Sequence, residues 1–137
     1  MIMNDSELMR MAEKARLAAY APYSDFCVGA ALLGVSGKVY CGCNIENAAF
    51  SPTVCAERVA IFKAVSEGER SFAAIAVTGG KRGEDASYCT PCGVCRQVMA
   101  EFCTADFRVL LGNSEDVRAL TLGELLPAAF GNEMRDV

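Results

Sequence analysis

Three cysteines constrain this chain more than any other feature of its sequence. Cys55 opens the segment Cys-Ala-Glu, and Cys92 and Cys95 belong to the segment Pro-Cys-Gly-Val-Cys. Three thiolates can hold a zinc ion and leave one coordination position open, which is the pattern of catalytic rather than structural zinc. Glu57 follows Cys55 by two residues, so it is placed to move protons at the water that zinc activates rather than to bind the metal. The fold must therefore bring two distant segments together.

Both cysteine segments fall at predicted helix starts. Ser51-Pro52-Thr53 offers an N-cap for a helix over residues 54–67, and a second helix is predicted over residues 93–102. The free N–H groups and the dipole of a helix start stabilise thiolates. Because helical side chains lean toward the N-terminus, Cys55 and Glu57 can both reach an ion at the helix end. Two facing helix starts would form a site at one edge of a sheet.

The remaining segments predict that sheet. A helix is predicted over residues 5–20, and a short helix or turn region over residues 122–130. The predicted strands cover residues 27–33 and 38–43, which form a hairpin, and residues 72–78, 107–111 and 117–121, with a polar loop over 79–87. A helix, a hairpin and then strands alternating with helices imply one sheet covered on both faces.

The cysteines also allow other interpretations. Cys92 and Cys95 alone could form a redox pair, and Cys89 could replace Cys95 as a ligand. Cys41 and Cys43 could close a structural site of four thiolates. Catalytic zinc is favoured because Cys92 and Cys95 bracket a helix start, whereas Cys89 precedes the proline in a loop. The other cysteines lie on predicted strands or a helix face, where a free cysteine is most often a small core residue: Cys27, Cys41, Cys43 and Cys103.

The charge of a three-thiolate site adds a further candidate. Three thiolates around Zn²⁺ leave a net negative charge, which weakens the metal as a Lewis acid, and a positive neighbour would offset it. Arg58 and Arg96 each follow a cysteine motif directly and could donate hydrogen bonds to sulfur. Both could equally be solvated helix arginines. Arg58 is favoured for the neutralising role.

Length, charge and composition limit the kinds of molecule that this chain can bind. The chain of 137 residues is long enough to bury a core as one domain without disulfides. Its net charge of -4 and the lack of a Lys or Arg run disfavour a nucleic-acid partner. The longest apolar run, residues 28–35, is too short for a membrane span, and residues 1–10 do not form a secretory signal. We therefore expect a cytoplasmic protein with reduced cysteines and a small, neutral or cationic substrate.

These segments resemble the small cytidine deaminases of nucleoside salvage, in their homotetrameric, three-cysteine form. Zinc deaminases share a Pro-Cys-x-x-Cys signature and a Glu that is not a ligand. The resemblance implies a single zinc-dependent deaminase domain over residues 1–137, folded as a three-layer α/β/α sandwich with a mixed five-stranded sheet. In order and spacing it extends over nearly the whole chain, through the segments Tyr23–Leu32, Asn44–Ala48, Cys55–Arg58, Pro91–Gln97 and Leu125–Phe130.

The resemblance also implies roles outside the zinc site. Asn44 and Glu46 are expected to hold the ribose hydroxyls, since the amide can donate to a sugar OH and the carboxylate can accept from one; otherwise Asn44 would cap a strand-end turn. Phe26 is expected to contact the pyrimidine, its alternative being a core residue, and Ala56 is expected at the substrate. Phe130 is expected to reach into the site of a neighbouring subunit in a homotetramer.

The expected reaction is the hydrolytic deamination of cytidine and deoxycytidine, with Glu57 as base and acid in turn. Three alternatives remain. A deaminase of this fold could act on another cytosine nucleoside, such as blasticidin S, but Asn44, Glu46 and Phe130 favour an ordinary nucleoside. An editing deaminase on nucleic acid is opposed by the acidic charge. A non-catalytic zinc-binding module would leave Glu57 without a purpose.

Overall fold

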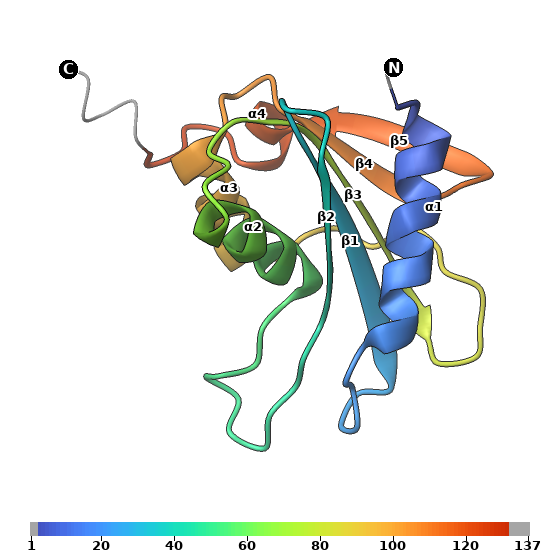
Figure 1. The fold of residues 1–137 in the computed structure, drawn as a ribbon. Helices are drawn as coiled ribbons and strands as arrows, with labels where there is room; N and C mark the ends of the chain where they lie inside the picture. The colour runs from blue at the N-terminus through green and yellow to red at the C-terminus, as the bar shows by residue number, and fades with distance from the viewer. Residues whose placement is uncertain (1–2, 132–137) are drawn as a thin grey trace.

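One mixed sheet forms the centre of the molecule (Figure 1). The computed structural model describes residues 3–131. The strands are β1 (Phe26–Gly34), β2 (Val39–Cys43), β3 (Phe72–Lys81), β4 (Arg108–Asn113) and β5 (Asp116–Thr121), in the order β2-β1-β3-β4-β5. Strands β3 and β4 are parallel, and the other neighbours are antiparallel. The predicted hairpin and the mixed five-stranded sheet are confirmed.

Helices cover both faces of this sheet (Figure 1). Helix α1 (Asp5–Ala15), followed by a 3₁₀ turn at Arg16–Ala18, lies on one face. Helices α2 (Ala56–Ser66) and α3 (Gly93–Phe102) lie on the other, and α4 (Leu122–Leu125) packs beside α3. The three-layer α/β/α arrangement is thus confirmed. Within residues 3–131, none of these helices has the length and apolar character needed to cross a bilayer.

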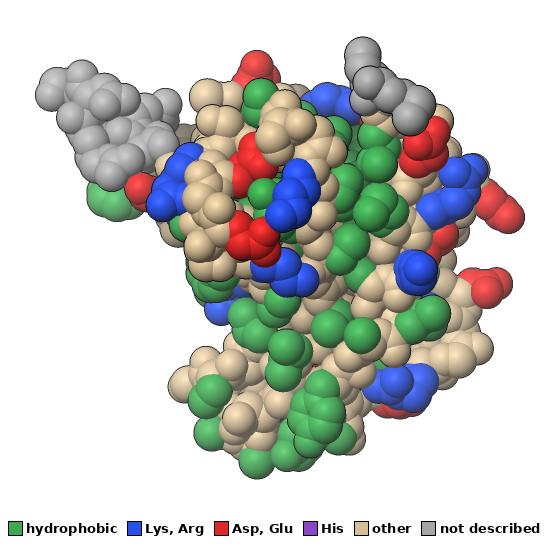
Figure 2. Space-filling view, viewed as in Figure 1, with side chains coloured by type: hydrophobic (Ala, Val, Ile, Leu, Met, Phe, Trp, Pro, Cys, Tyr) green, Lys and Arg blue, Asp and Glu red, His purple; other side chains and the backbone are tan. Residues whose placement is uncertain are grey.

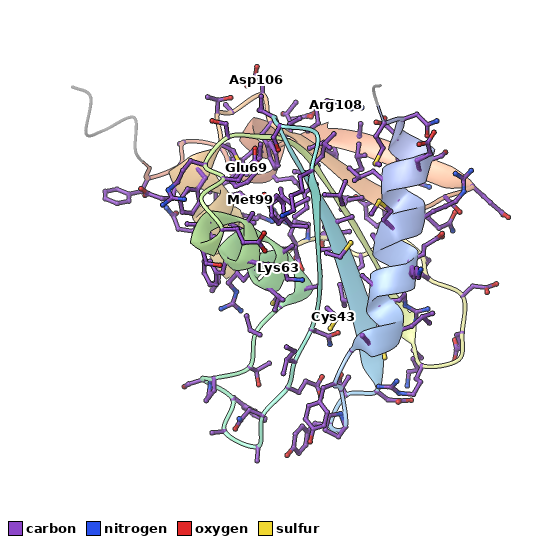
Figure 3. The ribbon with its side chains drawn as sticks, viewed as in Figure 1. Cys43, Lys63, Glu69, Met99, Asp106 and Arg108 are labelled. Carbon is purple, nitrogen blue, oxygen red and sulfur yellow. The ribbon has the colours of Figure 1, made fainter. Side chains whose placement is uncertain are left out.

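Successive side chains of each strand point to opposite faces of the sheet, so the buried residues form one cluster on each face. Ala31 and Leu110 pack with the apolar side of α1, whereas Ala30 and Leu32 pack with α2 and α3. Met99 of α3, which has no exposed surface, belongs to this second cluster (Figure 3). Each fully buried large side chain stabilises the fold by about 1.5–3 kcal/mol. Helix α2 packs against β2 and β1, and this packing fixes the position of its first turn relative to the sheet.

Helix α2 begins later than its sequence predicts. The N-cap is Cys55, not a residue of the segment 51–53. Val54 and Ile45 exchange two backbone hydrogen bonds of 3.0 Å, which keep Val54 extended and delay the helix. Thr53 Oγ1 accepts instead from the N–H of Asn47 at 3.1 Å. The predicted cap was wrong because a long-range bridge overrides it.

Two other boundaries also differ from expectation. The helix predicted over residues 5–20 is α-helical only to Ala15, because the N–H of Tyr20 donates to the carbonyl of Asn44 and draws the chain toward β2. Strand β3 continues to Lys81, where it pairs with Phe26 at the start of β1. The first residues of the predicted 79–87 loop are therefore strand.

The edge strand β2 and helix α2 lie unusually close together. A Cβ on Gly42 would lie 2.5 Å from the carbonyl oxygen of Ala56 and 2.7 Å from the nitrogen of Ala60. Only glycine permits this approach, which sets the first turn of α2 against the sheet. Lys63 of α2 also donates from Nζ to the carbonyl of Cys41 at 2.5 Å; Lys63 and the nearby Cys43 are labelled in Figure 3.

Candidate active site

The three predicted thiols meet where α2 and α3 begin. Cys55 is the N-cap of α2, Cys92 is the N-cap of α3, and Cys95 lies in the first turn of α3. Neither cap side chain accepts a helix N–H. The Sγ atoms of Cys55 and Cys92 are 3.6 Å apart, those of Cys92 and Cys95 are 3.5 Å apart, and all three lie within 4.8 Å of one another.

This cluster has the dimensions of a zinc site. Tetrahedral Zn²⁺ with Zn–S bonds of about 2.3 Å separates its sulfur ligands by roughly 3.8 Å, close to the observed spacings. The donors are thiols, which zinc prefers, and their number leaves a fourth position open. Among the described residues, neither Cys89 nor the strand cysteines Cys41 and Cys43 belong to the group. The residues present therefore fit zinc.

Glu57 is a buried carboxyl beside the thiols. Its side chain stands in the first turn of α2, and the residue is 3% exposed. Burial raises the pKa of Glu57 to about 7, and the negative charge of Cys55 acts in the same direction. A carboxyl with a pKa near neutrality can both accept and donate a proton, which general acid–base catalysis requires.

The thiols share one hydrogen-bonded charge. The pKa of Cys55 is lowered, mainly because the Cys95 thiol donates to its sulfur and also because Arg58 does so, while burial opposes the shift. The pKa of Cys95 is raised by that same hydrogen bond and by burial. These opposite shifts have one cause, the hydrogen bond that joins the sulfur atoms of Cys55 and Cys95. A bound cation would favour thiolates at all three positions.

A cleft of about 180 Å³ opens onto this cluster. It brings together most of the predicted site residues, which come from the loop after β2 and from the starts of α2 and α3: Asn44, Glu46, Cys55, Ala56, Glu57 and Cys92. Residues that were not predicted to bind substrate also line it: Val28, Thr53, Val54, Cys89 and Thr90. Polar groups with hydrogen-bonding capacity thus converge on one hollow with the thiols and the buried carboxyl.

Asn44 and Glu46 are held by the start of β1. Asn44 accepts from the N–H of Val28 and donates to the carbonyl of Phe26, each at 2.8 Å, so it does serve as a strand-end cap. Glu46 accepts from the N–H groups of Tyr23 and Ser24 at 2.9 and 3.1 Å. Beyond these contacts, the amide of Asn44 retains one N–H, so capping and ligand binding are compatible.

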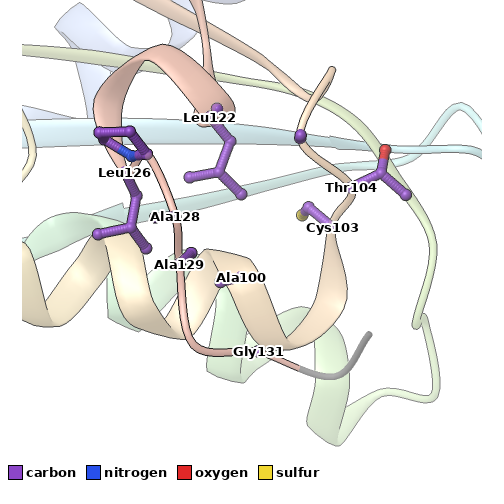
Figure 4. A pocket seen from close by; sticks show the side chains of 11 residues that line it. Ala100, Cys103, Thr104, Leu122, Leu126, Ala128, Ala129 and Gly131 are labelled. Carbon is purple, nitrogen blue, oxygen red and sulfur yellow. The ribbon is translucent and has the colours of Figure 1, made fainter. Parts of the chain in front are cut away.

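A second hollow lies between α3, α4 and the C-terminal segment (Figure 4). Its volume of about 320 Å³ exceeds that of the cleft. Its lining is mainly small and apolar, including Leu122, Leu126 and Ala129, and no charged residue among residues 3–131 belongs to it. Because chemistry needs convergent polar groups, the smaller cleft is the candidate active site.

Comparison with known proteins agrees with this geometry. The family model described as "Cytidine and deoxycytidylate deaminase zinc-binding region" matches residues 2–111. The chain belongs to the cytidine deaminase family. Cytidine deaminases of Sporosarcina psychrophila and Halalkalibacterium halodurans are each 52% identical over 132 residues, covering 96% of this chain and 94% and 97% of theirs. The crystal structure of cytidine deaminase from Burkholderia pseudomallei has a TM-score of 0.85 at 48% identity, covering 93% of this chain and all of that one.

A cytidine deaminase is a zinc-dependent hydrolase, and the two arginines behave differently around its zinc-binding region. Arg58 donates from Nη2 to Cys55 Sγ at 3.5 Å, and its buried Nε has no partner among the described residues. Arg96 instead donates to the carbonyls of Pro91 and Leu125 at 2.8 and 2.6 Å. Arg58 is thus available to neutralise sulfur charge, whereas Arg96 ties the loop before Cys92 to α4.

The two aromatic residues expected in a cytidine deaminase site lie in different places. Phe26 stands beside the cleft wall, since a Cβ on Gly79 would lie 2.9 Å from its ring and 3.1 and 3.3 Å from Val28 and Cys89, which line the cleft. Phe130 does not line the cleft of its own chain. Its side chain is 73% exposed, and its carbonyl accepts from Gln97 Nε2 of α3 at 2.6 Å. Phe130 is therefore free to contact another molecule.

Proposed function

We propose that this chain catalyses the hydrolytic deamination of cytidine and deoxycytidine to uridine and deoxyuridine, with release of ammonia, in pyrimidine salvage. The observation that carries the proposal is the burial of Glu57 in the same cleft as Cys55 and Cys92. A structural zinc site would have no use for a buried carboxyl beside the thiols, because such a group is expensive to bury. A hydrolytic site needs such a group to move protons.

The zinc site consists of Cys55, Cys92 and Cys95 in this proposal. When bound, zinc supplies a Lewis acid that makes water a competent nucleophile near neutral pH. Glu57 accepts a proton from the water that attacks C4 and delivers it to the ring N3. Glu57 then takes the proton of the new C4 hydroxyl and passes it to the leaving amine, so that the C4–N bond breaks, the C4 carbonyl of the uracil forms and ammonia departs. Arg58 limits the negative charge on the Cys55 sulfur.

The polar end of the cleft is proposed to recognise the sugar. Asn44 and Glu46 lie there with hydrogen-bonding capacity to spare. Phe26, beside the cleft wall, is proposed to contact the pyrimidine, and Ala56 lies between the first thiol and Glu57 at the floor. An analogue without any hydroxyl within reach of Asn44 and Glu46 should be used poorly, because these polar groups would be left unpaired.

Assembly completes the proposal. Exposed hydrophobic side chains gather at the end of the molecule formed by the loops before β1 and after β2 (Figure 2). They include Tyr20, Tyr23 and Phe50. Such a patch is a liability for a monomer and suits an interface between copies. We propose a homotetramer in which Phe130 covers a neighbour's cleft, each chain contributing one deaminase domain over residues 1–137. A cytoplasmic location and a nucleoside rather than a nucleic-acid or membrane partner fit the charge of -4.

An ultraviolet assay on the zinc-loaded protein tests the function. Cytidine and deoxycytidine should be converted to their uracil products, with free cytosine and CMP used much more slowly. Equal assays at several zinc loadings would show whether turnover follows the metal content. Faster use of CMP or of an oligonucleotide than of cytidine would overturn the nucleoside assignment.

A further inference from the structure

A serine outside the predicted site residues connects two of them. The hydroxyl of Ser24 donates to Glu46 Oε2 and accepts from the N–H of Phe26 at 3.0 Å. Its backbone N–H donates to Glu46 Oε1 at 3.1 Å. The carbonyl of Phe26 in turn accepts from Asn44. Ser24 therefore stands between the carboxylate and the backbone that holds the amide.

The bonds around Glu46 determine what remains for a ligand. A carboxylate offers about four acceptor sites on its two oxygens. Oε1 uses two of them on the N–H groups of Tyr23 and Ser24, and Oε2 uses one on the Ser24 hydroxyl. The vacant acceptor direction lies on Oε2, and the Ser24 hydroxyl decides where it points. The same hydroxyl is the main cause of the lowered pKa of Glu46, so the carboxylate stays ionised and acceptor-only.

We propose that Ser24 is a positioning residue for sugar recognition: its hydroxyl aims the free acceptor site of Glu46 at a nucleoside hydroxyl. The inference rests on the proposed function, in which Glu46 binds the sugar. Ser24 does not touch the thiols or Glu57 in this account; it acts through the carboxylate alone. Loss of its hydroxyl should therefore weaken recognition of the sugar and leave the proton transfers intact.

The backbone at this turn is held in an uncommon conformation. Asp25 has a φ of 58°, in the left-handed region that non-glycine residues seldom adopt. The N–H of Arg82 donates to the carbonyl of Asp25 at 3.0 Å, and its guanidinium lies 3.4 Å from the Asp25 carboxylate. Strained backbone persists where surrounding contacts over-determine it, and it concentrates at ligand clamps. Contacts from outside the turn thus keep Ser24 in place.

The chain contains a matched control. Ser36, beyond the other end of β1, donates its hydroxyl to Glu69 Oε1 at 2.6 Å and its N–H to Oε2 at 3.2 Å. The hydroxyl also accepts from the N–H of Lys38, two residues later, at 3.3 Å. The local chemistry resembles that of Ser24 and Glu46, but Glu46 lines the cleft and Glu69 does not.

The test compares cytidine with 2′,3′-dideoxycytidine, which lacks the 2′- and 3′-hydroxyls of the sugar but keeps the 5′-hydroxyl. Ser24→Ala should lower kcat/KM for cytidine about tenfold, chiefly through KM, and that for the dideoxy nucleoside less than about twofold. Ser24→Thr keeps the hydroxyl and should restore most of the loss. Ser36→Ala should leave both values within about twofold of wild type. The ratio of the two substrates is independent of the folded fraction, so poor folding of a variant cannot imitate the result.

A double-mutant cycle identifies the route of the effect. In a Glu46→Ala background, Ser24→Ala should lower kcat/KM for cytidine by less than about twofold further, because the group it positions is gone. Equal losses on both nucleosides, or full additivity with Glu46→Ala, would overturn the proposal. If Glu46→Ala itself fails to distinguish the two nucleosides, the sugar role of Glu46 is wrong instead. Should dideoxycytidine react too slowly, inhibition constants for uridine and 2′,3′-dideoxyuridine give the same ratio.

Discussion

The turns at the two ends of β1 have the same hydrogen bonds but a different residue at their centre. In each, a serine gives its N–H and hydroxyl to a glutamate and accepts from the backbone two residues later. The residue after the serine is left-handed in both: Gly37, with a φ of 94°, in the hairpin turn, and Asp25, with a φ of 58°, beside the cleft. Figure 3 labels Glu69, which follows α2 and accepts the hydrogen bonds of Ser36 in the hairpin turn.

The difference shows that this fold accepts an unfavourable backbone conformation beside the cleft and avoids one in the hairpin turn. The hairpin turn uses glycine, which adopts a positive φ without steric conflict. The turn beside the cleft uses Asp25 and needs Arg82 to hold it. The same end of the molecule also has cysteines as helix N-caps and a buried carboxyl at Glu57. A serine–glutamate turn is therefore not a site by itself; the helix starts make it one.

The largest effect should come from removing a thiol of the cluster. Cys92→Ala should lose zinc and all measurable activity, because two thiols remain where three are needed. Cys89→Ala, a change in the same cleft but outside the cluster, should retain one zinc per chain. Elemental analysis of both purified proteins decides the matter. If instead Cys89→Ala lost zinc and Cys92→Ala kept it, Cys89 would be the ligand, and the metal would not lie between the two helix starts.

Glu57→Gln should have the next largest effect. The amide keeps the size of the side chain but cannot shuttle protons, so kcat should fall by about 10²–10⁴ or more with zinc retained. Its melting temperature should not fall, since a buried amide is less costly to desolvate than a carboxylate. Glu69→Gln, at the hairpin turn, should change kcat by less than about twofold. If the activity of Glu57→Gln stayed within tenfold of wild type, Glu57 would not be the proton carrier, and the cleft end of β1 would not differ from the hairpin end in its chemistry.

Phe130→Ala should have a smaller effect that extends the comparison to a second subunit. The cleft lies open in one chain, so loss of a covering aromatic should raise KM about tenfold without loss of zinc. Mixing this protein with Glu57→Gln under subunit exchange should create sites that pair an intact Glu57 with a neighbour's intact Phe130. Activity should then rise. If native mass spectrometry shows exchange but activity stays at the sum of the parts, Phe130 does not act in trans.

The smallest effect concerns the two left-handed residues themselves. Gly37→Asp should lower the free energy of unfolding by about 1 kcal/mol, because a Cβ in this conformation is strained. No atom lies within 4 Å of that Cβ, so the change reports the backbone alone. Asp25→Gly should change stability by less than about 0.5 kcal/mol, since relief of strain is offset by the lost Arg82 contact and a freer unfolded chain. Chemical denaturation measures both; an unaffected Gly37→Asp would contradict the strain argument.

Local patterns predicted the layers of the fold better than the ends of its elements. The hairpin, the sheet and the start of α3 at Cys92 depend on apolar patterning and local sequence signals, which a sequence shows directly. The helix start at Ala56 depends on the bridge between Ile45 and Val54, and the end of β3 depends on its pairing with Phe26. Such contacts join residues far apart in the chain, so no local signal reveals them.

The same limit applies to the candidate site. The residue types and spacing of the cysteines and of Glu57 indicate metal binding and proton transfer, so these residues could be predicted from the sequence. The choice between Arg58 and Arg96 required coordinates, because both follow a motif and only contacts show that Arg96 binds carbonyls. Ser24 gave no signal, since a serine between tyrosine and aspartate before a strand indicates an ordinary turn. Its importance appears only when Glu46 lies against it.

The contact between Lys63 and the carbonyl of Cys41 has a consequence for how copies of the chain avoid one another. Strand β2 ends the sheet, so its outward backbone groups are a template on which a foreign strand can grow into an aggregate. The ammonium occupies one of those acceptors and places a charge along the row. An incoming strand would have to displace it and desolvate it. Lys63 thus disfavours the addition of further strands to this edge, and with it the growth of open-ended aggregates of the chain.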